Sequence, residues 1–386
     1  MDKENILFVN GCTRLFDLIG YTIADPEEGI LVSSPCYGSL QRDFGSRAAV
    51  RIVPVPFQGV DQFSIEAIEC YEKTFQESNA SGTRIRALLI CNPHNPLGQL
   101  YAPDVLQAYM EFCAKHNIHL IVDEIYAVSC YKTPTLPQTH APHSPIPNDG
   151  PASRSDPPPA IPFHSALRFE PGKPLRATHL HVLYGLSKDF AAGGLRLGCV
   201  VTRSAPLRQS LAALGFLSWP ANATEALAAA LLRDRRWCRA FHARSQRVLA
   251  RSAEAAARLL DGLRVPHNAE EAAAGFFLWV DLRRWVGAAG GGWDGEEVVH
   301  RAMHDAGLFL TPGRQMSAEE PGFFRLCFAR TEEEVREGVR RLWSALSKFE
   351  DGVNDDGFVK LKDGPSIDAG NGVKLEDKLK QLEIST

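Results

Sequence analysis

The stretch Tyr184-Gly185-Leu186-Ser187-Lys188-Asp189-Phe190, followed by Gly193-Gly194-Leu195-Arg196-Leu197-Gly198, decides the fold. It lies between two apolar runs, 180–184 and 197–201, that read as buried strands. A lysine therefore leaves the end of one strand, and an arginine follows before the next. A lysine amine can form a Schiff base, and an arginine fork binds phosphate in a bidentate way. Taken alone, the pair favours an ordinary surface lysine and an ion-paired arginine.

Similar apolar runs alternate with helical patterns through residues 1–220. Such runs, rich in Val, Ile and Leu with little polar alternation, are typical of a mostly parallel sheet that is covered on both faces. Helical patterns such as 103–115 separate them, which indicates a layered α/β domain. The predicted strands are 30–33, 51–55, 87–91, 120–122, 180–184 and 197–201.

Composition divides the chain into three parts and an insert. We predict a large domain at 1–220, interrupted by a Pro-rich insert at 132–178 that is expected to be a mobile surface loop. A smaller α+β domain is predicted at 221–348, and a polar, disordered tail at 349–386. Within these parts we expect one long helix over 221–263, strands at 275–281 and 323–328, helices at 297–306 and 332–348, and at most a short helix at 375–382.

A doubled Asn-Pro turn directly follows the run 87–91. The segment reads Cys91-Asn92-Pro93-His94-Asn95-Pro96-Leu97-Gly98. Asn and Pro favour a turn, and ligands bind at the carboxyl ends of strands in open α/β sheets. Asn95 is therefore a candidate for a ligand contact, although an ordinary Pro-rich turn has the same composition.

An acidic residue ends the run 120–122. The segment reads Leu120-Ile121-Val122-Asp123-Glu124-Ile125-Tyr126. A buried carboxylate at this position can keep a cofactor ring nitrogen protonated, and it can equally serve as a helix N-cap. We take Asp123 as the candidate and expect Glu124 to be structural.

A glycine turn precedes an apolar helical pattern near the start, in Val9-Asn10-Gly11-Cys12-Thr13-Arg14. The N–H groups and the dipole at a helix start make a ready phosphate site. Glycine before a helix is common, so this signal is weak by itself. It becomes informative only in combination with the other motifs.

An arginine lies inside the apolar segment Phe324-Arg325-Leu326-Cys327-Phe328-Ala329. An arginine in such a strand needs a partner, because charged side chains are almost never buried unpaired. Its fork suits a carboxylate, either of the protein in a salt bridge or of a substrate.

Together, these five motifs and their order resemble the class I/II pyridoxal-phosphate (PLP)-dependent aminotransferase family, of fold type I. Within it, the chain is most similar to the 1-aminocyclopropane-1-carboxylate (ACC) synthase-like branch, in its fungal type. The resemblance covers residues 1 to about 346. It implies an aspartate-aminotransferase-like α/β fold, with a large domain whose sheet is mostly parallel and a smaller α+β C-terminal domain.

The resemblance also implies residue roles. Lys188 would be the catalytic lysine that carries PLP, and Arg325 would bind the substrate α-carboxylate. The remaining residues would hold the cofactor: Gly11, Cys12, Thr13, Ser187 and Arg196 around the phosphate, Tyr37 stacked on the ring, Asn95 and Tyr126 at the ring hydroxyl, and Asp123 at the ring nitrogen. No metal is implied.

The implied activity is that of a PLP-dependent transferase or lyase acting on an α-amino acid. Amino-group transfer, γ-elimination with ring closure to ACC, and β-elimination by a carbon–sulfur lyase stay open, the last typical of fungal secondary metabolism. A further alternative is a truncated, catalytically inactive protein of the same fold. Family members form dimers with shared active sites, so a homodimer is expected.

Two departures from the family pattern bear on activity. Gly185 stands where a phosphate-binding serine is common, so that one hydroxyl contact is missing. The family also carries roughly a hundred further residues, about the size of a small domain, before the phosphate loop. They include a segment that closes over the substrate and a tyrosine that reaches the neighbouring subunit. Their lack here is expected to affect activity and dimerisation more than the fold.

Composition excludes several other classes. The net charge of −4 gives no reason to expect nucleic acid or an anionic membrane as a partner. No run is long and apolar enough to span a bilayer, and the first residues lack the features of a signal peptide. The nine cysteines include no Cys-x-x-Cys pair and indicate neither a disulfide framework nor a zinc site. A cytoplasmic protein with reduced thiols is the expectation.

Overall fold

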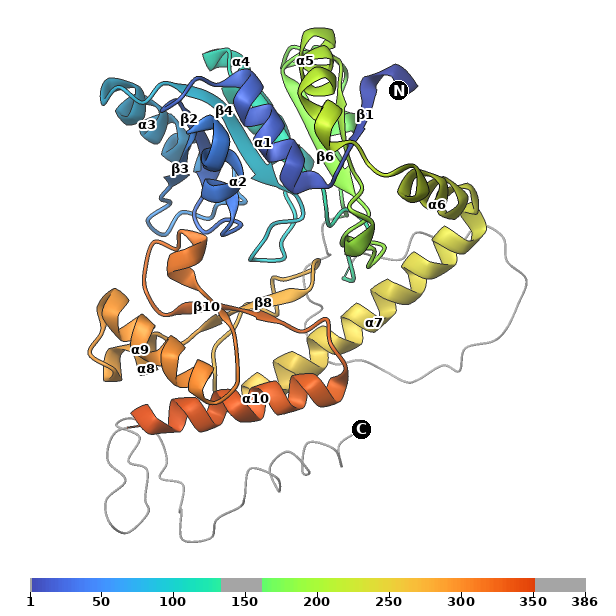
Figure 1. Ribbon diagram of the computed structural model, residues 1–386. Coiled ribbons are helices and arrows are strands. Elements are labelled where there is room, and N and C mark those ends of the chain that lie inside the picture. Colours follow the sequence, from blue (N-terminus) through green and yellow to red (C-terminus); the bar gives the residue numbers. More distant parts are fainter. Residues whose placement is uncertain (1, 133–161, 351–386) are drawn as a thin grey trace, which may run out of the picture.

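The computed structural model describes residues 2–132 and 162–350, and two sheets organise them (Figure 1). The larger sheet has seven strands, of which β6 through β3 run parallel, whereas β7 is antiparallel to both of its neighbours. Their order across the sheet is β1 (Ile6–Val9), β7 (Gly198–Thr202), β6 (Leu180–Gly185), β5 (His119–Asp123), β4 (Ile85–Cys91), β2 (Gly29–Ser33) and β3 (Arg51–Val55). The α/β class with a mostly parallel sheet is confirmed.

Helices cover both faces of this sheet. Helices α1 (Cys12–Ile23), α2 (Leu40–Ala48) and α5 (Ala205–Gly215) share one apolar core with Ile30 and Val32, whereas α3 (Ala67–Ala80) and α4 (Pro103–His116) share another with Leu31. Successive side chains of β2 therefore enter opposite cores, as the pleat of a strand requires. Two-sided burial explains why these strands are continuously apolar.

The smaller sheet has the order β8 (Phe277–Asp281), β10 (Phe323–Cys327) and β9 (Thr311–Pro312), and all its pairs are antiparallel. Its apolar core is separate from those of the large sheet. Helices α8 (Arg283–Ala288), α9 (Gly292–Asp305) and α10 (Glu332–Leu346) pack around it, and Thr331 with Glu334 forms a capping box at the start of α10.

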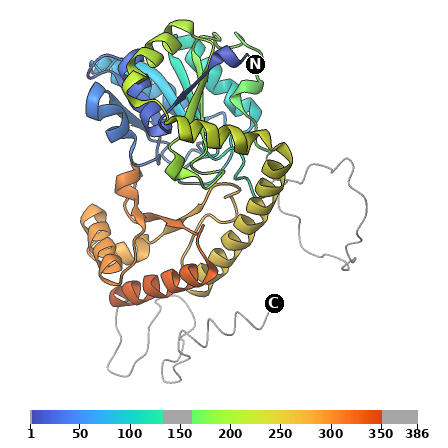
Figure 2. The same cartoon turned by 45° about the vertical axis from the view of Figure 1, so that its right-hand side comes forward.

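The predicted long helix over 221–263 is two helices, α6 (Asn222–Arg233) and α7 (Arg235–Gly262). Asp234 separates them, because its carboxylate accepts the Trp237 N–H at 2.8 Å and caps α7. Helix α7 then runs from the large domain to the small one, as both views show (Figures 1 and 2). Its C-terminal half, from Leu249 to Leu260, lies in the small-domain core.

Several hydrogen bonds join the small domain to the large one after the carboxyl ends of β2 and β3. The Cys36 N–H donates to the Met316 carbonyl at 2.8 Å. The Glu319 carboxylate accepts the N–H groups of Phe57 and Gln58, at 2.6 and 3.0 Å. The small domain therefore lies against the carboxyl ends of parallel strands of the large sheet.

Short 3-10 turns complete the described elements. They are η1 (Lys3–Asn5), η2 (Ala166–Arg168), η3 (Gly193–Leu195), η4 (Phe216–Ser218), η5 (Gly313–Met316) and η6 (Ser347–Phe349). Turn η2 belongs to residues 162–178, the described end of the Pro-rich insert, where Ala166 and Leu175 are buried in a large-domain core. The rest of the insert, 133–161, and the tail 351–386 with its predicted helix at 375–382 lie outside the described residues. Within the described ranges, no helix is long and apolar enough to cross a membrane.

Candidate active site

The predicted site residues come from seven separate segments, and the topology brings six of these to one edge of the large sheet. Asn95, Asp123 and Lys188 follow the carboxyl ends of β4, β5 and β6, which are adjacent and parallel. Tyr37 follows β2, the loop Gly11 to Thr13 lies between β1 and α1, and Arg196 precedes β7. Arg325 reaches the same place from β10 of the small domain.

The start of α1 and Arg196 form the predicted anion-binding end. Gly11 is the N-cap residue with φ of 81°, and a Cβ there would lie 2.5 Å from the Arg196 Nη2 atom. Only glycine allows this close approach of a guanidinium to the helix start. Thr13 and Arg196 also line a polar hollow of about 420 Å³. In the described ranges no carboxylate lies within ion-pair distance of Arg196, so its charge is available to an anion.

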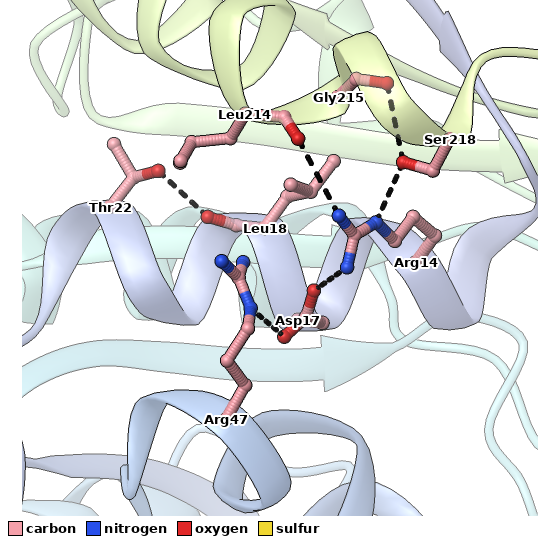
Figure 3. Close-up of polar contacts among 8 residues, drawn as sticks. All are labelled: Arg14, Asp17, Leu18, Thr22, Arg47, Leu214, Gly215 and Ser218. Atoms are coloured by element: carbon pink, nitrogen blue, oxygen red, sulfur yellow. Dashed lines mark hydrogen bonds and ion pairs between the residues drawn. The ribbon is translucent and has the colours of Figure 1, made fainter.

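Arg14 fixes the orientation of this helix start (Figure 3). Its Nε atom donates to the Ser218 hydroxyl at 2.9 Å, and it forms an ion pair with Asp17, one turn further along α1. Asp17 in turn accepts from Arg47 of α2 at 2.8 Å. The charge of Arg14 is thereby balanced within the protein, and α1 is tied to both η4 and α2.

The Cys12 side chain lies against Gly185. A Cβ at Gly185 would lie 3.0 Å from the Cys12 Sγ atom and 3.0 Å from the Leu197 carbonyl oxygen. The Cys12 thiol donates to the Tyr184 carbonyl at 3.3 Å, and burial raises its pKa well above the ordinary value. The thiol therefore occupies the space that a side chain at position 185 would need. This contact explains the glycine, which the sequence showed only as a missing hydroxyl.

Asp123 is a buried carboxyl group without an ion-pair partner among the described residues. One oxygen accepts the Ile125 N–H at 3.2 Å. Burial raises the pKa of Asp123 to about 7, opposed by that hydrogen bond and by the nearby charge of Lys188. A protonated ring nitrogen supplies the partner that this carboxylate lacks. The residue therefore fits a PLP cofactor.

Tyr126 lies close to the other ring-binding candidates. Burial raises the pKa of the Tyr126 hydroxyl well above its ordinary value. The charge of Arg325 lowers this pKa, and Tyr37 raises it slightly, so both residues lie near the hydroxyl. The aromatic rings of Phe276 and Phe277 contact the Tyr126 ring edge-on, at 5.5 and 5.4 Å between centroids. These contacts restrict the tyrosine to one orientation.

Arg325 joins the small domain to the Asn-Pro turn. Its Nη1 atom donates to the Asn95 Oδ1 atom at 2.9 Å, and its Nη2 atom donates to the Thr311 hydroxyl at 3.2 Å. The Phe277 ring lies 5.4 Å from the guanidinium carbon. The described residues give Arg325 neutral partners and no carboxylate, so the fork keeps its capacity for an external one.

Lys188 is exposed on the turn that follows β6, and Ser187 before it is half-buried beneath Gly193. The charge of Lys188 lowers the pKa values of both the Cys12 thiol and the Asp123 carboxyl, so the lysine lies near both groups. Glu124 faces the other way and accepts the Ala166 N–H at 2.8 Å, in agreement with the structural role expected for it. Thr311, Phe277 and Asp189 were not foreseen as site residues.

Comparison with known proteins identifies the family. The model for aminotransferase class I and II matches residues 1–342. The chain belongs to this family. It is 32% identical over 345 residues to "Probable aminotransferase gliI" of Aspergillus fumigatus, covering 86% of this chain and 72% of that one. It is also 32% identical over 359 residues to 1-aminocyclopropane-1-carboxylate synthase 3 of rice, and the match covers 90% of this chain and 74% of the rice protein.

Two further comparisons concern the length of the relatives and the fold. The ACC synthase-like protein 1 of Takifugu rubripes is 28% identical over 370 residues, which are 94% of this chain and 55% of that protein. The chain thus spans little more than half the length of some curated relatives. A Thermus thermophilus aspartate aminotransferase mutant has a TM-score of 0.69 at 20% identity, over 89% of this chain and 81% of that one. This likeness confirms the aspartate-aminotransferase-like fold.

Proposed function

We propose that this aminotransferase-family chain is a PLP-dependent enzyme that transfers the amino group of an α-amino acid, with Lys188 as its catalytic residue. The observation that carries the proposal is Asp123, a buried acid whose pKa is raised to about 7 beside the charge of Lys188. Perturbed acids of this kind, placed near a lysine at the carboxyl ends of parallel strands, are typical of active sites.

When bound, the cofactor supplies an electron sink for the α-carbon of the substrate. The protein's own groups do the rest. Arg325 binds the substrate α-carboxylate as a fork and so orients the α-carbon. The Lys188 amine would accept the proton that leaves the α-carbon, and the Asp123 carboxylate would hold a proton on the ring nitrogen. Arg196 and the start of α1 bind the phosphate.

Amino-group transfer is favoured because the family model and the gliI relative both carry that activity in their names. The rice relative is named as an ACC synthase, which supports γ-elimination as the second candidate. The ACC synthase-like protein 2 of Mus musculus, to which the chain is 24% identical over 355 residues, is named "Probable inactive". That name supports the alternative without catalysis.

Exchange of the α-proton separates these alternatives in one experiment. The purified chain with PLP is incubated in deuterated water with single amino acids and a keto acid as amino acceptor. Mass spectrometry follows deuterium at the α-carbon of the remaining amino acid and the products formed. A new keto acid together with the aminated acceptor supports transfer, whereas ACC, or a released thiol with ammonia, supports elimination. No exchange with any of the amino acids contradicts the enzyme proposal.

Arg325→Lys is expected to lower kcat/KM by about 10²-fold, mostly through KM, because lysine keeps the charge but loses the two-pronged geometry. Steady-state kinetics over a range of amino acid concentrations measure the effect. Arg301→Lys is the matched control, because Arg301 is an exposed arginine of α9 with only a surface ion pair. Equal kinetics for Arg325→Lys and wild type would contradict the assignment of Arg325.

A homodimer is part of the proposal and rests on an exposed apolar turn. Phe216, Leu217 and Trp219 are 74%, 91% and 57% exposed, yet Arg14 holds this turn in place through Ser218. A rigid, exposed apolar cluster of this kind is typical of an interface.

Leu217→Asp is therefore expected to weaken self-association by at least about tenfold, because a charge would be buried in the interface. Sedimentation over a range of concentrations measures the dissociation constant. Val298→Asp, at a residue 46% exposed on α9, is the control and is expected to leave association unchanged. A monomeric wild-type protein at all concentrations contradicts the dimer.

A further inference from the structure

Asp189, the residue directly after Lys188, is buried although it lies on a turn, where charged side chains are usually exposed. Only 3% of the residue is exposed. Its Oδ2 atom accepts the Val128 N–H at 2.9 Å and the Tyr184 hydroxyl at 3.0 Å, and its Oδ1 atom accepts the Ser129 hydroxyl at 2.5 Å. Both carboxylate oxygens are thus engaged by donors from two other segments.

These donors lie on the segments that carry the remaining ring-binding candidates. Val128 and Ser129 follow Tyr126 in the loop after β5, so they move with Asp123 and Tyr126. Tyr184 lies at the end of β6, and its carbonyl accepts the Cys12 thiol. The Asp189 carboxylate therefore connects the turn of Lys188 with the loop of Asp123 and with the strand next to the anion-binding end.

A second set of contacts holds the same turn from the side of α7. The Phe190 ring is parallel to the Phe241 ring, with 6.0 Å between centroids, and its edge contacts His242 at 4.5 Å. Gln246, one turn further along α7, donates to the Val128 carbonyl at 3.0 Å. Lys188 is therefore an exposed residue next to two anchored ones, Asp189 and Phe190.

A carboxylate suits this position, because the Val128 N–H can only donate and the Ser129 and Tyr184 hydroxyls both donate to it as arranged. Burial raises the pKa of Asp189 to about 6, while the hydrogen bonds from Ser129, Val128 and Tyr184 lower it. At neutral pH the group is therefore ionised and acts as an acceptor through both oxygens. An amide in its place replaces one oxygen with an NH2 group, so that the Ser129 hydroxyl has to accept where it now donates, and the charge-assisted hydrogen bonds to the carboxylate are lost.

We propose that Asp189 is a positioning residue for Lys188: its bridge to Val128, Ser129 and Tyr184 fixes the backbone from which the Lys188 amine extends toward Asp123. The catalytic importance of Asp189 rests on the proposed function of Lys188. That Asp189 fixes the backbone at Lys188 does not depend on the cofactor. A purely structural role would make Asp189 important for stability and irrelevant to the reactivity of the amine.

The test compares Asp189→Asn with Glu124→Gln. Glu124 is also a buried carboxyl at the same end of the sheet, but it binds the Ala166 N–H on the side of the insert. Both substitutions replace a buried acceptor with an amide of the same shape, so both are expected to lower the thermal unfolding temperature by several degrees. Only Asp189→Asn is expected to change the behaviour of Lys188.

The first readout uses the protein without cofactor. A small amine-reactive reagent labels the lysines, and mass spectrometry gives the labelling rate of Lys188 relative to exposed Lys173. We expect Asp189→Asn to change this ratio by at least about threefold, because the amine loses a fixed environment, and Glu124→Gln to leave it unchanged. An unchanged ratio in Asp189→Asn, at a temperature where both proteins are folded, overturns the positioning role.

The second readout uses the protein with PLP and no substrate. The pH at which the visible absorbance changes reports the protonation of the Lys188 nitrogen, and Asp189→Asn is expected to shift it by about 0.5 unit or more. A tenfold loss in kcat with a nearly constant KM is expected to accompany the shift, since misplacement affects the chemical step. A wild-type protein that never takes up PLP covalently contradicts the proposed function, and the labelling experiment still decides the role of Asp189.

Discussion

Replacement of Lys188 by alanine is expected to abolish the covalent attachment of PLP and to lower kcat/KM by about 10⁴-fold or more. The amine is the group that both carries the cofactor and moves the α-proton, so no other residue compensates for its loss. Borohydride reduction followed by peptide mass spectrometry measures the attachment, and α-proton exchange measures the chemistry. In the wild-type protein, reduction is expected to fix the cofactor on the peptide that contains Lys188.

Lys173→Ala is the matched control for this experiment. Lys173 is an exposed lysine whose ion pair with Glu170 is on the surface, so its removal is expected to leave attachment and turnover unchanged. Thermal unfolding without cofactor is expected to be the same for all three proteins, because the exposed Lys188 side chain makes no described hydrogen bond that the fold needs. A cofactor adduct on another lysine in Lys188→Ala would show that the assignment is wrong.

Asp123→Asn is expected to change cofactor affinity and apo-protein stability in opposite directions. The asparagine does not carry the negative charge that stabilises a protonated ring nitrogen, so PLP is expected to bind at least about tenfold more weakly, with kcat lower by about 10²-fold. The apoprotein, by contrast, no longer has to bury an unpaired carboxylate at alkaline pH. It is therefore expected to unfold at a temperature several degrees higher than wild type at pH 8.

The sign of the pH dependence follows from the raised pKa. The Asp123 carboxyl ionises near 3.8 in the unfolded chain and near 7 in the folded one. Between these values the folded state holds a proton that the unfolded state has lost, so the stability of the wild-type apoprotein falls as the pH rises through this window. Asp123→Asn removes this fall, and the stability difference between the two proteins is expected to be larger at pH 8 than at pH 5.

Glu124→Gln serves as the control because the adjacent Glu124 carboxyl also has its pKa raised to about 7 by burial. Its substitution is expected to alter the pH dependence of stability as well, but not the affinity for PLP, because Glu124 faces the insert. Urea unfolding at several pH values and a fluorescence titration with PLP separate the two effects. Equal PLP affinities for Asp123→Asn and wild type would contradict the role of Asp123.

The class of fold and six of the seven strands of the large sheet were predictable from the sequence, because strands buried on both faces, such as β2, β4 and β5, have a continuous apolar pattern. The edge strand β1 was missed: Ile6 to Val9 form a short run next to the stronger glycine signal at Gly11. The end of α6 was also missed, since Asp234 interrupts the helical pattern by capping the next helix and not through a proline or glycine.

The site was predictable where a residue type and its place at a strand end both point to the same chemistry, as for Lys188 and Asp123. The contacts between segments were not predictable. The space at Gly185 is limited by Cys12, far away in the sequence, and the partners of Asp189 come from a loop after β5. Local patterns contain no information about such neighbours, because these are set by the register of β5 against β6 and β6 against β7.

Helix α7 connects the turn that carries Lys188 with the core of the small domain. Its 28 residues span about 42 Å as a continuous helix, with Phe241 against Phe190 near one end and Leu260 inside the small-domain core near the other. A tilt of about 5° displaces one end of such a rod by roughly 4 Å relative to the other. Any rocking of the small domain that brings Arg325 toward or away from a substrate therefore also pushes on the turn that carries Lys188.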